Sequence, residues 1–432
     1  MARRVTLVAW GSRGDVAPIL SLGRGLRDSG DIVTVLTSRD FAELVELAGL
    51  HWAPFDISVQ DAASTAAGRA WLGGHRTLIG EGRALQKVLD GFAQPLIEGL
   101  WRHTRDADLV ISGILTADAC ASLTAARDQQ HAVALMTPVM PSRHGRSSPT
   151  AVLPSRDSGI NALSGRAVLT ASYRLLRVPG DDLRQRLGHR RTRGGWLLAR
   201  LREMPVIVGT SRYVVPPAPD QPNVTITGYW PPFGASLDPH EAERVEAAIA
   251  RAHQDSRPVA YLGFGSMTTR DPAGTARLLM GAALDAGVHP ILSNGWAGVG
   301  AHLTGRDDVT LVDNMPHDWL FARSDAVVHH GGAGTTGSAI RTGTPQVVVA
   351  HMGDQPFWAI RAHLLGIAAE PLRRSRVTRQ QLAAALRHVT APGSADTVQR
   401  HARELAQRVE TEDGVSTAVE VLRGDTKASL RP

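Results

Sequence analysis

The sequence predicts an α/β protein built from two consecutive domains, each a parallel sheet covered by helices. Short apolar runs alternate with helical patterns from Val5 onward, and a second series of the same kind begins at Val259. The proline-rich passage Pro216–Pro219 separates the two series, and 432 residues are enough for two or three domains of ordinary size. Because strands that alternate with helices usually pair in parallel, both series indicate parallel sheets.

In the first series the apolar runs are short and the helical patterns lie between them. We expect strands at Val5–Ala9, Ile32–Thr37, Leu109–Ser112 and Ala132–Met136, and helices at Ile19–Asp28 and Phe41–Ala48. Residues 141–165 are rich in Pro, Ser, Arg and Gly, which predicts a loop. Two short strands, Val206–Thr210 and Val224–Thr227, are expected on either side of the proline-rich passage.

The second series continues to the end of the chain. We expect strands at Val259–Phe264, Pro290–Ser293, Val309–Val312, Ala326–His329 and Val347–Ala350, and helices at Ala273–Ala286, Arg379–Val389 and Thr397–Leu422.

Composition limits the class of protein and its location. The single cysteine, Cys120, excludes an internal disulfide and is compatible with a reducing compartment. The apolar run at the N-terminus is too short for a signal sequence, and no apolar stretch approaches the ~20 residues that span a bilayer. We therefore expect a cytoplasmic protein.

The net charge of +6 comes mainly from arginine, which is dense between Arg143 and Arg202. One interpretation is a pair of solvated helices, which is the usual meaning of a charge run. The other is a face that contacts an anionic membrane or an acidic acceptor. Nucleic acid is not expected as a partner, because no aromatic residues are interleaved with the arginines.

The most informative segment is Val327–Gln355, which reads as strand, glycine-rich turn, helix, strand and loop. Glycines at 331, 332 and 334 let backbone N–H groups approach an anion, and the following helix adds the positive end of its dipole. His330 can donate to the same anion, while Asp354 and Gln355 can bind hydroxyl groups. Phosphate at one end and hydroxyls at the other describe a nucleotide-sugar.

This segment resembles the nucleotide-sugar signature of the family 1 glycosyltransferases, which have the GT-B fold. The closest likeness is to the branch that contains sterol glucosyltransferases and glycopeptide-antibiotic glycosyltransferases. Further motifs occur in the order typical of that branch: Gly11–Pro18 (GSRGDVAP), Tyr229-Trp230, Tyr261–Met267 (YLGFGSM) and Asn314–Phe321 (NMPHDWLF). Five motifs over most of the chain make the resemblance specific.

The resemblance implies two Rossmann-like domains facing across a cleft that closes on substrate. The expected division is an acceptor-binding domain at 1–215, a linker at 216–235, a donor-binding domain at 236–405, a returning C-terminal helix at 406–423 and a flexible tail at 424–432.

It also implies the residues that bind the donor. His330 matches the histidine that contacts the α-phosphate, and strand alternation turns His329 the other way, toward a structural role. Asp354 and Gln355 match the acidic-Gln pair that holds the sugar. Plant relatives have a tryptophan where this chain has Asn314, so uridine and thymidine both remain open as the base. The remaining candidate donor contacts are Arg13, Ser266, Met315, His317, Gly332, Gly334 and Thr335.

The proposed catalytic base is Asp15, which stands where many relatives have a histidine. The alternative is that Asp15 only caps the following helix. Asp118 lies near the place of a supporting acid and is a second candidate. The one Asp-x-Asp pair, Asp106 and Asp108, reads as a polar turn before a strand, so we expect no metal site and no cofactor beyond the nucleotide-sugar substrate.

The function expected from these residues is inverting, metal-independent transfer of a hexose or deoxyhexose from a UDP- or dTDP-sugar to a hydroxyl of a lipophilic acceptor. Inversion follows from a single displacement, since the family pattern offers no second carboxylate for a covalent intermediate. Two alternatives remain: a nucleotide-sugar epimerase or hydrolase on the same fold, and a non-catalytic partner of another transferase. The sequence leaves open the sugar, the acceptor and whether the protein is a monomer or a homodimer.

Overall fold

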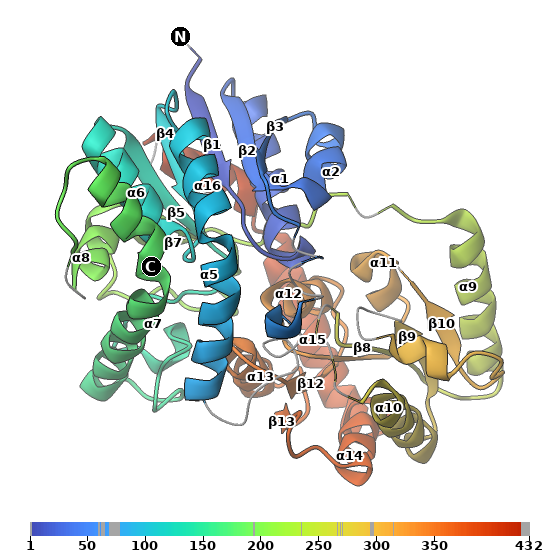
Figure 1. Cartoon of the computed structure of the whole chain (residues 1–432). Coiled ribbons are helices and arrows are strands. Elements are labelled where there is room, and N and C mark those ends of the chain that lie inside the picture. The colour runs from blue at the N-terminus through green and yellow to red at the C-terminus, as the bar shows by residue number, and fades with distance from the viewer. Residues whose placement is uncertain are drawn as a thin grey trace. The chain divides into compact units, whose positions relative to one another are not determined.

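The computed structural model describes residues 2–58, 61, 65–68, 78–192, 195–234, 236–265, 267, 269, 271–293, 298–313 and 315–424. These residues form two compact units (Figure 1). The first unit contains the described residues up to Gly234 together with those from Glu412 onward, and the second contains those from 236 to Thr411.

The first unit is built around a sheet of seven described strands in the order β3-β2-β1-β4-β5-β6-β7, all parallel. Its strands are β1 (Arg4–Val8), β2 (Ile32–Ser38), β3 (His51–Phe55), β4 (Leu109–Ser112), β5 (Gln130–Leu135), β6 (Val206–Val208) and β7 (Val224–Ile226). Its helices are α1 (Arg13–Asp28), α2 (Ala42–Leu47), α5 (Leu78–His103), α6 (Ala117–Arg127), α7 (Gly159–Arg186), α8 (Trp196–Glu203) and α16 (Gly414–Arg423), with short 3-10 turns at η1 (Arg39–Phe41) and η2 (Gly145–Ser147).

Alternate residues of each strand bury into helices on opposite faces of this sheet. Val5 and Leu7 of β1 pack with α1 and α16, whereas Val8 packs with α5 and α6. This two-sided burial explains why the strands read as continuous apolar runs.

The helix α1 begins at Arg13, six residues before the predicted start at Ile19. Ser12 is its N-cap, and the carboxylate of Asp15 in the first turn accepts from the Ser12 backbone N–H at 2.8 Å. Pro18 lies inside this helix, which continues past it although the proline lacks the N–H that would bond to the Gly14 carbonyl. The predicted start of this helix is therefore six residues too late.

The predicted helix Thr397–Leu422 is two helices, α15 (Ser394–Glu410) and α16. Asp413 caps α16 by accepting from the backbone N–H of Ser416 at 3.0 Å. Gly414 is required there because a Cβ would lie 2.4 Å from the carbonyl oxygen of Tyr229. The Trp230 indole donates to the Gly414 carbonyl at 3.0 Å, which ties α16 to the first unit.

The second unit contains a sheet of six described strands in the order β10-β9-β8-β11-β12-β13, also parallel. Its strands are β8 (Val259–Gly263), β9 (His289–Ser293), β10 (Thr310–Val312), β11 (Ala326–His329), β12 (Gln346–Ala350) and β13 (Leu372–Arg373). Its helices are α9 (Pro239–Gln254), α10 (Pro272–Ala286), α11 (His317–Phe321), α12 (Ala333–Arg341), α13 (Gln355–Leu364), α14 (Arg379–Thr390) and α15, with a 3-10 turn at η3 (Val299–His302).

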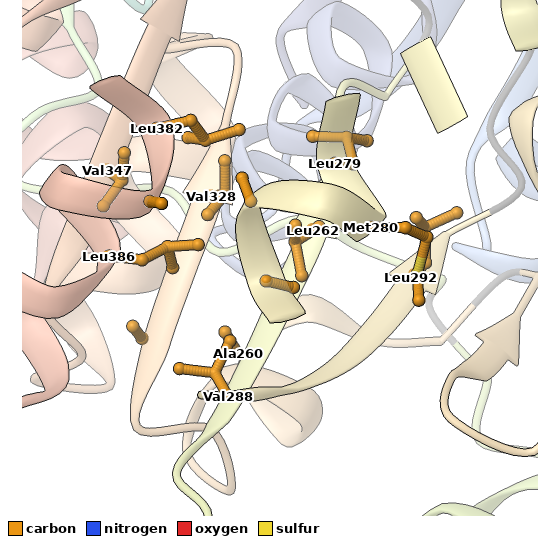
Figure 2. Packing of buried hydrophobic residues seen from close by; sticks show 14 of the residues in the cluster. Ala260, Leu262, Leu279, Met280, Val288, Leu292, Val328, Val347, Leu382 and Leu386 are labelled. Atoms are coloured by element: carbon orange, nitrogen blue, oxygen red, sulfur yellow. The ribbon is translucent and has the colours of Figure 1, made fainter. Parts of the chain in front are cut away.

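One face of the second sheet packs against α10 and α14. Figure 2 shows Ala260 and Leu262 of β8 and Val328 of β11 among the leucines of these helices, including Leu279 and Leu386. The intervening residues Val259, Tyr261 and Val327 point into the opposite cluster, which α9, α11 and α12 cover.

Three further expectations differ from the structure. The predicted loop 141–165 is too long, because α7 begins at Gly159 with the Ser158 side chain as its N-cap. The predicted linker 216–235 contains β7, the last strand of the first sheet. The boundary placed between residues 405 and 406 falls inside α15, and the chain leaves the second unit after Thr411 instead. Of the predicted tail at 424–432, Gly424 is the C-cap of α16, and residues 425–432 lie outside the described residues.

Candidate active site

The strand order marks one place in each sheet where a ligand is expected. In both sheets the order reverses beside the first strand, between β1 and β4 in one unit and between β8 and β11 in the other. Ligands of open parallel sheets bind outside the carboxyl ends of the strands at such a reversal. In the second unit the two ends are Gly263 and His329, and His330 follows directly.

The ring of His330 lies against two glycines at this reversal. A Cβ on Gly332 would be 2.5 Å from its Nε2, and a Cβ on Gly265 would be 3.3 Å from its Cε1. Gly265 also has a φ of +56°, which disfavours other residues. The imidazole therefore occupies space that two missing side chains leave between the end of β8 and the start of α12.

The His330 ring is not satisfied by the protein around it. Its Nδ1 is buried and has no hydrogen-bond partner within the described residues, although buried polar atoms are normally paired. Burial, followed by the nearby His329, His351 and His317, holds the pKa of His330 well below its usual value. The imidazole is thus neutral near pH 7 and can donate one hydrogen bond to an anion.

His329 has the structural role that strand alternation predicted. Its Nδ1 accepts from the backbone N–H of Gly331 at 3.1 Å, and its Nε2 lies 2.9 Å from Oε1 of Gln346. Since Nδ1 is an acceptor, Nε2 carries the proton and donates to Gln346. Burial lowers the pKa of His329 to about 4, and the neutral ring fixes the turn that presents His330.

The N-terminus of α12 supplies backbone donors beside His330. Gly332 is the N-cap, and the first intrahelical bond runs from Thr336 N–H to the Gly332 carbonyl at 2.9 Å. The N–H groups of Gly334 and Thr335 precede that bond and so have no intrahelical acceptor. Gly334 is exposed, and a Cβ there would meet no atom within 4 Å, so the approach to these donors is open.

The loop after β12 places Asp354 and Gln355 in different situations. Asp354 is the N-cap of α13, and the indole of the buried Trp358 donates to its Oδ2 at 3.0 Å, which orients the carboxylate. The Gln355 carbonyl oxygen accepts from the backbone N–H groups of His351 and Met352 at 2.8 and 3.0 Å. The Gln355 side chain thus holds this loop, and within the described residues its amide nitrogen makes one long contact, 3.6 Å to the Met267 sulfur.

The other predicted donor contacts are spread more widely. Met315 is buried in the core cluster of α9 and α11, so its side chain is packed in the core and is not exposed to the base of a nucleotide. His317 opens α11, with its ring stacked on Phe321 at 4.7 Å and half-buried. Arg13, in the first unit, donates to the Gly234 carbonyl at 2.5 Å. Ser266 and Asn314 lie outside the described residues.

Two residues of the second unit, His351 and Arg374, were not singled out by the sequence interpretation. His351 packs edge-on against Phe264 at 4.8 Å, and burial lowers its pKa to about 4. Arg374 is half-buried beyond β13, donates to Thr275 at 2.7 Å, and forms no ion pair within the described part of the chain. Neither had a sequence signal, because β13 is only two residues long and His351 resembles any loop histidine.

In the first unit, Asp15 follows β1 at the corresponding reversal. It is exposed, and its Oδ2 accepts from the backbone N–H and the hydroxyl of Ser12 at 2.8 and 3.0 Å. A Cβ on Gly11 would lie 2.3 Å from the same oxygen, so glycine leaves room for the carboxylate. The capping role is therefore present, and the carboxylate that fills it is exposed.

Asp118 is placed differently, in a buried ion pair. Both of its oxygens lie 3.1 Å from the Arg184 guanidinium, which also bonds Asp181 and the Ser122 hydroxyl and lies against the Trp196 ring. The carboxylate is only 2% exposed and joins α6 to α7. This geometry favours a structural role and provides no support for Asp118 as a supporting acid.

The buried pair makes a prediction about stability. Burial outweighs Arg184 and raises the pKa of Asp118 from 3.8 to about 6. The folded protein then holds this proton more tightly than the unfolded chain, so the group stabilises most below about pH 4 and the contribution is lost as pH rises through about 6. Measured by urea unfolding, wild type should lose about 3 kcal/mol relative to Asp118→Asn across this window. A relative gain in stability with rising pH would contradict the assignment.

The described residues contain no group of three or more His, Cys, Asp or Glu side chains placed to hold a metal ion. The Asp-x-Asp pair has the structural role expected of it, since Asp108 accepts from the backbone N–H of Arg4 at 2.7 Å. Among the described helices, none is long and apolar enough to cross a membrane.

The fold and this site together define a two-domain protein of the GT-B class. Residues 280–420 match a family model described as the C-terminal domain of erythromycin biosynthesis protein CIII-like proteins. The structure is similar to the calicheamicin glycosyltransferase CalG4, with a TM-score of 0.69, 18% identity and full coverage of both chains. It is also similar to the glycosyltransferase VinC in complex with dTDP, with a TM-score of 0.63, 19% identity and coverage of 98% and 100%.

Curated relatives point the same way. The chain is 30% identical, over 98% of its length, to a sterol 3-beta-glucosyltransferase of Aspergillus clavatus, but spans only 30% of that protein. It is 29% identical over 96% of its length to a sterol 3-beta-glucosyltransferase of Arabidopsis thaliana and spans 67% of it. These matches support the resemblance to family 1 glycosyltransferases with the GT-B fold that the motifs predicted.

Proposed function

We propose that this protein transfers a hexose or deoxyhexose from a UDP- or dTDP-sugar to a hydroxyl group of a lipophilic acceptor. The observation that carries the proposal is the neutral, unsatisfied imidazole of His330 beside the N-terminus of α12, at the strand reversal of the second unit. The similarity to sterol 3-beta-glucosyltransferases supports a lipophilic acceptor.

The donor pyrophosphate is held by hydrogen bonds alone in this mechanism. The imidazole of His330 and the N–H groups of Gly334 and Thr335 donate to phosphate oxygens, and the helix dipole of α12 adds partial positive charge. The same donors stabilise the charge that develops on the departing nucleoside diphosphate, so the reaction proceeds without a divalent ion. Asp354, oriented by Trp358, accepts from hydroxyls of the sugar.

Asp15 is the proposed base. Its carboxylate accepts the acceptor's hydroxyl proton while the hydroxyl oxygen forms a bond to the anomeric carbon and the bond from that carbon to the pyrophosphate breaks. A single displacement inverts the anomeric centre. The test is product formation from UDP- and dTDP-sugars with sterol and macrolide acceptors in the presence of a metal chelator. Retained configuration in the product, or activity only with added Mg²⁺, would refute this mechanism.

Nucleoside diphosphates should stabilise the protein before any acceptor is present. A ligand that binds only the folded state at about 100 times its Kd adds about 2.7 kcal/mol, and each kcal/mol raises Tm by about 2–4 °C in a domain of this size. We therefore expect UDP or dTDP to raise the thermal midpoint by at least about 5 °C, whereas the free nucleosides, which lack the pyrophosphate, raise it much less. Equal shifts from nucleoside and diphosphate would count against the phosphate site.

A further inference from the structure

The outward face of α7 carries apolar side chains that nothing in the first unit covers. Six of the eleven large hydrophobic residues that are exposed in the described chain fall between residues 152 and 178: Val152, Leu153, Ile160, Leu163, Val168 and Val178. Leu163 is 66% exposed and Ile160 is 49% exposed. Such a concentration on one segment marks an interaction surface rather than the scattered exposure of an ordinary surface.

Three of these residues, Ile160, Leu163 and Val178, lie on one side of the helix. Positions 160, 163, 167, 171, 174 and 178 follow each other at intervals of three or four residues, and they hold Ile, Leu, Ala, Ala, Arg and Val. Each is exposed. The helix therefore presents a continuous apolar stripe to solvent over five turns, interrupted only by Arg174.

The loop before α7 adds its apolar residues next to the start of the helix. The buried side chain of Asn161 accepts from the backbone N–H of Leu153 at 2.9 Å and donates to the carbonyls of Arg156 and Arg143 at 2.8 and 3.2 Å. These bonds fix the loop against the first turn of α7. Val152 and Leu153 are thus held beside the helix in a defined position.

The stretch of chain that carries this apolar surface is mainly basic. Residues 141–178 contain six arginines and one acidic residue, Asp157, which pairs with His144. All six arginines are exposed, and only Arg177 has an acidic partner within the described residues, Asp181 at 3.8 Å. The others are Arg143, Arg146, Arg156, Arg166 and Arg174. Two copies of this face would bring like charges together, whereas an anionic surface would neutralise them.

We propose that the outward face of α7, together with Val152 and Leu153, docks on an anionic lipid surface. An amphipathic helix with an apolar stripe and basic flanks lies in the plane of the headgroups, with the apolar residues at the acyl boundary and the arginines on the lipid phosphates. This surface is separate from the residues that hold the nucleotide, so the inference does not depend on the proposed function.

Vesicle sedimentation tests the proposal with the full chain. Wild type should bind vesicles of phosphatidylglycerol and phosphatidylcholine, and added salt should weaken the binding. Vesicles of phosphatidylcholine alone should bind at least about tenfold less, because each arginine near an anionic surface contributes about fivefold in affinity. Equal binding to both vesicles, or no binding at low salt, overturns the proposal.

Two sets of variants identify the surface. Ile160→Ser with Leu163→Ser, and Arg156→Gln with Arg166→Gln and Arg174→Gln, should each lower affinity for the anionic vesicles by about 100-fold. The matched controls lie in the second unit and should change affinity less than about twofold: Leu284→Ser with Leu364→Ser, and Arg251→Gln with Arg277→Gln and Arg400→Gln. Controls that lose as much affinity as the α7 variants overturn the assignment.

Light scattering after size exclusion tests whether a second copy of the chain, rather than a lipid surface, covers this face. If wild type is a dimer that dissociates on Ile160→Ser with Leu163→Ser, the stripe joins two copies of the chain and the lipid proposal fails. Each variant should have a Tm within a few degrees of wild type, about the shift that 1 kcal/mol produces. A loss of vesicle binding is then due to the altered surface and not to unfolding.

Discussion

Replacing His330 by alanine is expected to weaken nucleotide-sugar binding by about 10- to 150-fold, the loss that corresponds to one hydrogen bond to a charged group. The imidazole is neutral and lacks a protein partner at Nδ1 within the described residues, so a phosphate oxygen can use its N–H without displacing another bond. Calorimetry with UDP- and dTDP-sugars measures the effect. An unchanged dissociation constant would remove His330 from the site.

Two further variants distinguish the position of the His330 ring from a general loss of stability. Gly332→Ala would place a Cβ 2.5 Å from the His330 Nε2 and should displace the ring, with a comparable loss of affinity while the histidine is still present. His388→Ala removes an exposed histidine at the end of α14 in the same unit and should leave affinity unchanged. Similar losses in His388→Ala would indicate a general effect of destabilisation.

The second large effect is expected from Asp15→Asn, which should reduce transfer by about 10²- to 10⁴-fold because the acceptor hydroxyl loses its base. Asparagine retains an oxygen that can accept from Ser12, so the start of α1 should be preserved. Donor affinity should stay within about twofold of wild type, since the phosphate donors lie in the second unit. Progress curves and calorimetry on the same variant measure both quantities.

Ser12→Ala is the matched control for the capping role of Asp15. It removes the hydroxyl that lies 3.0 Å from the carboxylate but leaves the carboxylate in place. We expect a loss of about 1 kcal/mol in stability, with most of the transfer rate retained. If Ser12→Ala were as inactive as Asp15→Asn, the geometry of the helix start, rather than proton transfer, would explain both results. Wild-type transfer by Asp15→Asn would eliminate the base.

The buried strands were the part of the fold most accessible to sequence analysis. Leu109–Ser112 and Ala326–His329 are found with the predicted boundaries, because each is a short apolar run with polar or glycine residues on both sides. The start of α1 and the break before α16 were missed, since both depend on capping by one side chain. A two-residue strand such as β13 has no detectable period.

The candidate site was predictable in its backbone and less so in its side chains. The glycine pattern after β11 indicated an anion site, and the strand reversal places it where ligands of such sheets bind. The sequence could not reveal that the carbonyl oxygen of Gln355 is used by the backbone of its own loop, or that Asp118 is paired with Arg184. Both facts depend on contacts in the folded protein that the positions of these residues in the sequence do not predict.

The return of α16 to the first unit has a consequence for dissecting the protein. The described residues of the second unit all fall between 236 and Thr411, so a gene segment for residues 236–411 encodes the six strands described in its sheet, with their helices. The other portion is split, and truncation at Gly234 would strip Ala418, Val419 and Leu422 from the apolar side of α1. The two units therefore differ in how they can be produced separately. The second unit can be expressed alone as residues 236–411, whereas the first unit also needs α16, supplied as a fused or co-expressed peptide.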